Sequence, residues 1–136
     1  MSERAQQNLA VLREYFDAMT QGGPPATMPF YADDAELIVP GSHEASGTYR
    51  GLDGVGQFGA TMRRLTDGTF RLSPIDLFAS DDRVVTYATA SAEAGGKRLE
   101  WTRVIMTDIV EGKFARLQFF ESDQDAVDAL LTGASS

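Results

Sequence analysis

The chain has 136 residues, of which 43% are hydrophobic and 24% charged, a size and composition typical of one soluble globular domain. It contains no cysteine and one histidine, which excludes disulfides, thiolate chemistry, iron–sulfur clusters, and zinc sites built from cysteines or several histidines. The formal net charge is -8 and the basic residues are scattered, which argues against a nucleic-acid partner.

The sequence also predicts location and domain organisation. The first residues are polar and form no apolar signal core, and no apolar run is long enough to cross a membrane. We therefore expect a cytoplasmic protein without a membrane partner, built as a single domain over residues 1–136.

The first half of the chain predicts helices and one strand. Apolar residues recur at steps of three and four through the first segment, as in an amphipathic helix, and Gly22-Gly23-Pro24-Pro25 ends that helix. The expected helices span residues 3–20, 26–31 and 53–65, and the expected strand spans residues 35–39. A polar loop at residues 42–47 follows the strand.

The third predicted helix is unusual because Gly54, Gly56 and Gly59 all lie in its first half. Each glycine inside a helix costs about 1 kcal/mol relative to alanine. We therefore expect either that another part of the chain packs very closely against this helix or that its first turns move.

The second half of the chain predicts four strands joined by short turns, and then a helix. The strands are expected at residues 70–79, 83–93, 98–110 and 114–121, and the helix at residues 123–131. Ser122 and Asp125 have the spacing of a capping box that opens this helix. Helices segregated from a run of antiparallel strands predict an α+β fold.

Both faces of the late strands are apolar. The alternation places Phe114 and Phe120 on one face of the last strand, and Leu117 and Phe119 on the other. A sheet that is apolar on both faces is covered on both, and the helices can cover only one. We therefore predict a homodimer that forms through the outer face of the sheet.

Four short segments carry a family likeness. They are FYADDAEL at residues 30–37, GTYRGLDG at 47–54, EGKFARL at 111–117 and FFE at 119–121. Together with the order of the elements, they resemble the nuclear-transport-factor-2-like superfamily, and within it the SnoaL-like group. The resemblance implies a cone-shaped, curved antiparallel sheet wrapped around N-terminal helices, a cystatin-like α+β barrel with a deep apolar pocket.

Members of this superfamily include ketosteroid isomerases, polyketide cyclases, limonene-epoxide hydrolases, dehydratases and non-catalytic binding modules, so the fold alone does not choose a function. Ketosteroid isomerases use a tyrosine and two aspartates. Tyr15 matches the tyrosine, but Val39 and Met106 occupy the positions of the aspartates. Isomerisation by that mechanism is therefore not expected.

The other family chemistries are also incomplete. Epoxide hydrolases of this fold hold an arginine between carboxylates. Arg103 is the matching arginine, but Gln118 replaces the carboxylate of the last strand. The cyclases pair a histidine of the penultimate strand with an acid, and Val104 stands in place of that histidine. Glu121 is the alternative acid if the register differs.

Three residues are candidates for catalysis: His43, Tyr15 and Gln118. The unperturbed pKa of histidine makes His43 the natural general base, and the alternative is a solvent-facing loop histidine. Tyr15 and Gln118 would polarise a ligand oxygen, and the alternatives are a core tyrosine and a satisfied buried amide.

The remaining candidates form the expected wall of the pocket. Arg103 would clamp an anionic ligand, or else would form a contact on the outer sheet face, and it shares its strand phase with Trp101. The wall residues are Phe16, Met19, Phe30, Tyr31, Phe58, Met62, Trp101, Arg103, Met106, Phe120 and Glu121. The alternative interpretation is that most of these apolar residues pack in the hydrophobic core and line no pocket.

Two functions remain open at this point, with a pure dimerisation module as a third. The first is a cofactor-free cyclase, isomerase, dehydratase or hydrolase that acts on a small apolar polyketide-, steroid- or terpenoid-like molecule by general acid–base chemistry. The second is a non-catalytic protein that binds such a molecule. No cofactor or metal is expected, because the glycines of residues 51–59 do not match the dinucleotide fingerprint and the acidic residues 121–125 lack a calcium-loop pattern.

Overall fold

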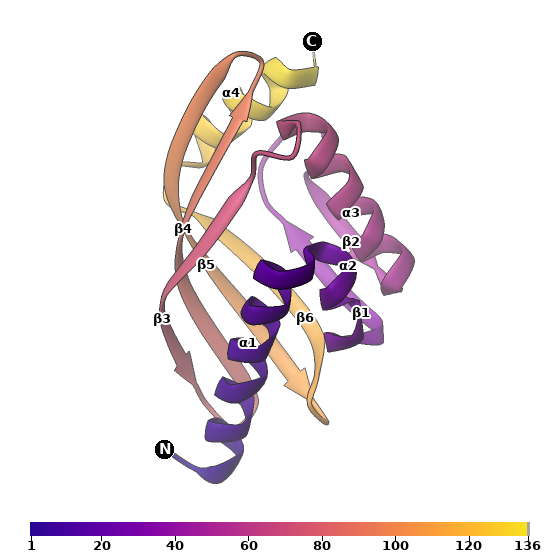
Figure 1. The fold of residues 1–136 in the computed structure, drawn as a ribbon, viewed down its shortest axis with the longest axis vertical. Helices are drawn as coiled ribbons and strands as arrows, with labels where there is room; N and C mark the ends of the chain where they lie inside the picture. The colour runs from indigo at the N-terminus through magenta and orange to yellow at the C-terminus, as the bar shows by residue number, and fades with distance from the viewer. Residues whose placement is uncertain (136) are drawn as a thin grey trace.

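The computed structural model describes the backbone of residues 1–135 and the side chains of residues 1–133. It is a mixed α+β structure in which the helices lie on one side of a curved sheet (Figure 1). The elements in chain order are α1 (Glu3–Gly22), α2 (Pro24–Thr27), a 3₁₀ turn (Met28–Phe30), β1 (Tyr31–Val39), β2 (Gly47–Arg50), α3 (Gly51–Thr66), β3 (Arg71–Ala79), β4 (Arg83–Ala94), β5 (Lys97–Val110), β6 (Lys113–Glu121) and α4 (Gln124–Ser135). The predicted α+β class and curved sheet are confirmed.

The strands of the described residues form one sheet in the order β2-β1-β6-β5-β4-β3. From β3 to β6 the sheet is the expected antiparallel meander. The sequence analysis did not anticipate two features: β1 joins the sheet parallel to β6, and β2 pairs with β1. Strand β2 was missed because its four residues follow a polar loop and bury little surface.

Two local predictions are wrong. Phe114 faces the same side as Leu117, because the β5–β6 register shifts by one residue between Asp108 and Ile109. A β-bulge of this kind reverses the alternation on one side of the shift. The cap of α4 is Asp123, whose carboxylate accepts the backbone N–H of Ala126 at 3.1 Å, and not the expected Ser122.

The core between the helices and the inner sheet face consists of two apolar clusters. The first joins α1 and α3 to the sheet and includes Leu12, Val55, Ile105, Phe114 and Phe119. The second lies beneath α4 and includes Met62, Trp101, Val127, Leu131 and the alanines at positions 90, 92 and 94 of β4. Phe58 of α3 and Leu72 of β3 pack against both clusters, so they mark the boundary between them.

The outer sheet face carries exposed apolar side chains. Tyr87, Val104 and Phe120 form one row across β4, β5 and β6, because they pair directly in register. Phe78 pairs with Val85 in the next row. Phe78 is 62% exposed and Phe120 is 44% exposed, and no element of the described chain covers this face.

Candidate functional site

A buried ion pair lies on the inner sheet face at the level where the two apolar clusters meet. Arg103 of β5 and Glu121 of β6 are opposite each other in the antiparallel register, so both side chains lie on the same face. The guanidinium donates from Nε to Oε1 at 2.8 Å and from Nη2 to Oε2 at 2.9 Å. The side chains are only 5% and 3% exposed.

Aromatic rings surround the pair. The indole Nε1 of Trp101 donates to Glu121 Oε1 at 3.2 Å. The guanidinium carbon of Arg103 lies 4.3 Å from the centre of the Phe119 ring and 5.1 Å from that of Phe70. Removing two charges from water is costly unless the geometry is good and further hydrogen bonds are made. The bidentate contact, the indole N–H and the cation–π contacts offset that cost here.

One polar group of the pair is left without a partner. Nη1 of Arg103 makes no hydrogen bond within the described residues. Nη1 is also not fully buried. Among the described residues, the fully buried side-chain N and O atoms that lack a hydrogen-bond partner are the hydroxyls of Thr86 and Thr107, and Nη1 is not one of them. Arg103 thus retains an Nη1 group that is neither fully buried nor hydrogen-bonded within the described residues.

His43 is half-buried in the loop between β1 and β2. Its Nδ1 accepts the backbone N–H of Ala45 at 3.1 Å, so the neutral ring carries its proton on Nε2. Burial lowers the pKa of His43, while Asp128 and Glu121 raise it and Arg103 lowers it to smaller extents. The ring is therefore mainly neutral near pH 7 and lies within electrostatic reach of the ion pair.

The carboxylate of Asp128 in α4 holds the loop of His43. It accepts the backbone N–H of Ser42 at 3.1 Å and the hydroxyl of Ser42 at 3.2 Å. It also accepts the side-chain amide of Gln124 at 2.9 Å, which fixes its orientation on the helix. Sequence analysis did not select Asp128, because a carboxylate in a surface helix has no distinguishing pattern.

Tyr15 of α1 approaches the site from the other side. Its hydroxyl lies 3.2 Å from the hydroxyl of Tyr31, and its ring makes edge contacts with Phe16, Phe30 and Phe114. Burial raises the pKa of the Tyr15 hydroxyl, while the bond to Tyr31 and the charge of Arg103 act in the opposite direction. Tyr15 is therefore a protonated donor within electrostatic reach of Arg103.

The structure separates the predicted site residues into two groups. The inner side of the sheet carries Tyr15, Tyr31, Trp101, Arg103 and Glu121. The wall residues Phe16, Phe30, Phe58 and Met62 belong to or pack against the core clusters, and Met19 is half-buried in α1. His43 lies in the half-buried loop that Asp128 of α4 holds through Ser42. Gln118, Met106 and Phe120 lie on the outer face, contrary to expectation. Met106 and Gln118 are register partners, and strand alternation gives the inner face to Trp101, Arg103 and Ile105.

Two aromatic residues of the site were missed. Phe119 and Phe70 flank the Arg103 guanidinium, although neither was expected to line the pocket. The strand phase that Phe119 shares with Glu121 was the signal that could have identified it. Phe70 was expected to open the strand at residues 70–79, but it immediately precedes β3, which begins at Arg71.

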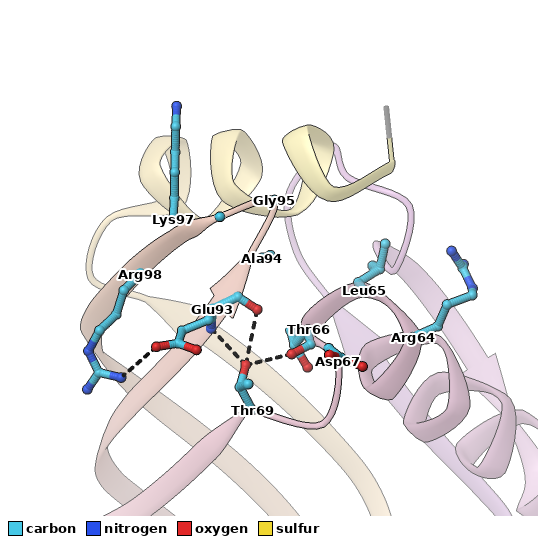
Figure 2. A pocket seen from close by; sticks show the side chains of 11 residues that line it. Arg64, Leu65, Thr66, Asp67, Thr69, Glu93, Ala94, Gly95, Lys97 and Arg98 are labelled. Carbon is cyan, nitrogen blue, oxygen red and sulfur yellow. Dashed lines mark hydrogen bonds and ion pairs between the residues drawn. The ribbon is translucent and has the colours of Figure 1, made fainter.

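Two open hollows do not include Arg103 or Glu121, although the second is bordered by Trp101. The larger, about 560 Å³, lies between the end of α3 and the β4–β5 hairpin (Figure 2). At its centre the Thr69 hydroxyl donates to the carbonyl of Thr66 at 2.6 Å and accepts the N–H of Glu93 at 2.8 Å. Lys97 and Arg64 extend away from that centre (Figure 2). The hollow thus lies where the end of α3 is hydrogen-bonded to the β4–β5 hairpin, and its polar groups do not converge on a ligand position.

The smaller hollow, about 500 Å³, lies on the outer sheet face and is lined mainly by hydroxyl-bearing side chains of β3, β4 and β5. The described residues contain no cluster of three or more side chains that could hold a metal ion. No helix in the described part of the chain is long and apolar enough to span a membrane. The cytoplasmic location and the absence of a nucleic-acid partner stay predictions.

Comparison with known proteins agrees with this architecture. Residues 12–117 match the SnoaL-like domain family, and the chain belongs to that family. Over 123 residues the chain is 28% identical to Uncharacterized protein Rv0034 of Mycobacterium tuberculosis, covering 90% of this chain and 94% of the relative.

Solved structures show the same fold. Bal32a, from a soil-derived mobile gene cassette, superposes with a TM-score of 0.88 at 25% identity, covering 95% of this chain and 99% of the other. A protein of unknown function with a cystatin-like fold from Xanthomonas campestris has a TM-score of 0.84 at 32% identity, covering 91% and 97%. These likenesses support the nuclear-transport-factor-2-like architecture.

Proposed function

We propose that this protein binds a small, largely apolar molecule between the helices and the inner sheet face, and that Arg103 holds an oxygen of that molecule. The observation that carries the proposal is the unpartnered Nη1 of a nearly buried arginine surrounded by aromatic rings. A donor that is largely shielded from water and has no protein partner is available to a ligand oxygen.

We propose further that the protein is a cofactor-free enzyme that stabilises negative charge on this oxygen, as cyclisation, isomerisation, dehydration or hydrolysis requires. Arg103 is the donor at the centre of this proposal, and its charge lowers the pKa of both His43 and Tyr15, whose Nε2–H and hydroxyl are the further candidate donors. Donors preorganised in a dry site stabilise a developing oxyanion far better than water does.

In this arrangement His43 acts first as a donor. Its Nδ1 is occupied by the Ala45 N–H, so proton uptake requires that this bond break. Two roles for His43 therefore remain to be distinguished by experiment: transfer of a proton, as the sequence predicts, and polarisation of the ligand oxygen.

A specific observation favours non-catalytic binding as the second candidate. Both oxygens of Glu121 are engaged by N–H donors from Arg103 and Trp101, so this carboxylate is poorly placed to accept a proton from a ligand. A site with several donors and an occupied carboxylate suits a binding protein.

The test is a thermal-shift screen of polyketide, steroid and terpenoid ligands, followed by mass spectrometry of each hit after incubation. A ligand at about 100 times its Kd stabilises the protein by about 2.7 kcal/mol, which such a screen detects. His43→Gln keeps an N–H donor but cannot titrate, and His43→Ala loses both properties. If the wild type and His43→Gln convert the ligand but His43→Ala does not, His43 polarises the ligand oxygen. If both variants lose the conversion, His43 transfers a proton. Hits that bind unchanged establish the binding protein, and the absence of any hit contradicts the proposal.

We also propose that the chain forms a homodimer through the outer sheet face. The exposed row of Tyr87, Val104 and Phe120, together with Phe78, supports this arrangement. An apolar surface that runs across several strands is unfavourable in water unless a partner covers it.

A further inference from the structure

The loop between β1 and β2 enters the second apolar cluster at one residue. Ala45 is fully buried and belongs to that cluster together with Met62 of α3 and Val127 of α4. The other residues from 40 to 46 are exposed or half-buried, so Ala45 is the point at which this loop reaches the core. We call residues 40–46 the strap, because they join two strands and contact two helices.

Both helices hold the strap from outside. The carboxylate of Asp128 in α4 accepts the backbone N–H and the hydroxyl of Ser42. Glu44 forms an ion pair with Arg64 of α3. Gly41 lies so close to α4 that a Cβ there would overlap the side chain of Asp128, and its φ of +98° also favours glycine. The strap is therefore fixed to both α3 and α4.

The backbone of Ala45 is hydrogen-bonded at both of its polar groups. Its carbonyl accepts the hydroxyl of Tyr49 at 3.0 Å, and its N–H donates to Nδ1 of His43 at 3.1 Å. When the imidazole takes up a proton, Nδ1 becomes a donor and no longer accepts this bond. A buried backbone N–H without a partner is costly. Protonation of His43 therefore opposes the burial of Ala45.

Charged groups from several elements act on the imidazole. Burial has the largest effect and lowers the pKa of His43. Asp128 of α4 and Glu121 of β6 raise this pKa, and Arg103 of β5 lowers it. Arg64 of α3 also faces the strap, through the ion pair described above. The ring is thus neutral near pH 7, and in acid the charge of Asp128 favours the imidazolium.

We infer that neutral His43 holds the strap in place and that protonated His43 releases it, so that Ala45 leaves the second cluster in acid. The strap is then a pH-sensitive device that depends on one side chain. Its release uncovers part of the cluster to which Trp101 belongs, and the indole of Trp101 bonds Glu121 of the ion pair. The inference does not depend on the proposed ligand or reaction.

Amide hydrogen exchange followed by NMR tests this device. The protection factor of Ala45, in which the intrinsic effect of pH on exchange is removed, should fall at least fivefold from pH 7.5 to pH 5.0. The fall should begin below about pH 6.5, where a released imidazole takes up its proton. The amide of Ile109 donates to the carbonyl of Asp82 in the β3–β4 turn at 2.9 Å. It is the internal control and should keep its protection.

Two variants separate the hydrogen bond from the charge. His43→Asn keeps an acceptor that reaches the N–H two residues further on, as in an Asx turn, and does not titrate. The protection of Ala45 should change less than twofold in this variant over the same pH range. In His43→Ala it should already be at least fivefold below the wild-type value at pH 7.5.

Two results would overturn the inference. One is a wild-type protein in which the protection of Ala45 is the same at pH 7.5 and pH 5.0. The other is an equal fall in wild type and His43→Asn, which would assign the effect to other titrating groups. The wild-type comparison decides by itself if a variant does not fold, and neither result affects the proposed ligand.

Discussion

The charged residues at the centre of the molecule are stable only as a set. Arg103 and Glu121 are nearly inaccessible to water, and each satisfies the other through two hydrogen bonds. Removing one partner leaves an uncompensated charge inside the protein, whereas replacing both with apolar side chains does not.

A double-mutant cycle tests this dependence. Glu121→Leu and Arg103→Met alone should each lower the free energy of unfolding by about 3–5 kcal/mol. The double variant should be more stable than either single variant. Urea unfolding monitored by circular dichroism measures all four proteins. A decrease in the free energy of unfolding below about 1 kcal/mol in both single variants would show that water reaches the ion pair.

Thr86 shows the opposite situation, a buried polar atom without compensation. Its hydroxyl is fully buried and has no partner in the described part of the chain. Thr86→Val keeps the shape and removes the hydroxyl, so we expect a gain of about 1 kcal/mol in urea unfolding. The exposed Thr89 of the same strand is the control, and Thr89→Val should change stability by less than about 0.5 kcal/mol. A loss of stability in Thr86→Val would reveal a partner for the hydroxyl.

His43 should make stability depend on pH. Its pKa is lower in the folded protein than in the unfolded chain, chiefly because of burial. Below about pH 6.5 the unfolded chain therefore binds more protons, and stability falls as the pH decreases. Wild type should lose more stability than His43→Gln between pH 7.5 and pH 5.5, measured by urea unfolding at each pH. Parallel curves for the two proteins would place the imidazole in solvent.

At the scale of the elements, α4 and the loop after β1 act as a unit. Asp128 accepts three hydrogen bonds, two of them from Ser42, and its charge raises the pKa of His43. The loop that carries His43 is therefore positioned from a helix more than eighty residues away in the sequence.

Asp128→Ala should thus have two effects. Loss of the hydrogen bonds should lower the free energy of unfolding by about 1–2 kcal/mol. Loss of the charge should lower the pKa of His43 further, as followed by proton NMR of the imidazole. Asp125→Ala, in the exposed first turn of the same helix, should change neither quantity by a comparable amount. An unchanged free energy of unfolding would mean that the loop is held in another way, and an unchanged pKa would mean that the charge of Asp128 does not act on the imidazole.

The elements themselves were largely predictable from the sequence, and the reasons differ among them. The long meander strands and α1 follow from periodicity and from glycine-rich turns, which are local signals. The parallel pairing of β1 with β6 and the bulge beside Phe114 were not predictable, because both depend on contacts between distant segments. The bulge mattered least to the site, because Arg103 and Glu121 lie beyond it, where the register is regular.

The candidate site was predictable only in part for the same reason. Shared strand phase indicated that Trp101 and Arg103 lie on one face, but which face could be decided only by the register with β4 and β6. Gln118 was assigned to the interior because it matched a family position, whereas alternation from Glu121 places it outside. The burial of Glu121 against Arg103 had no local signature at all.

At the scale of the whole molecule, the outer sheet face should determine the oligomeric state. Phe78→Glu, which introduces a charge into the exposed apolar surface, should convert a dimer of about twice 14.8 kDa into a monomer. Light scattering coupled to size exclusion measures the mass. Leu52→Glu, at an exposed apolar position of α3, is the control and should leave the dimer intact. A wild-type mass of one chain contradicts the proposed interface.

The central claim is that the interior between the helices and the sheet receives an apolar molecule whose anionic oxygen pairs with Arg103. The most direct test is amide chemical-shift mapping of the wild-type protein with 2-naphthoate and with 2-naphthylmethylammonium, which share a ring system and carry opposite charges at neutral pH. The account predicts that the anion binds at least tenfold more tightly and shifts the resonances of Trp101 and Arg103. Equal or stronger binding of the cation, or shifts confined to the outer face around Tyr87 and Phe120, would contradict it.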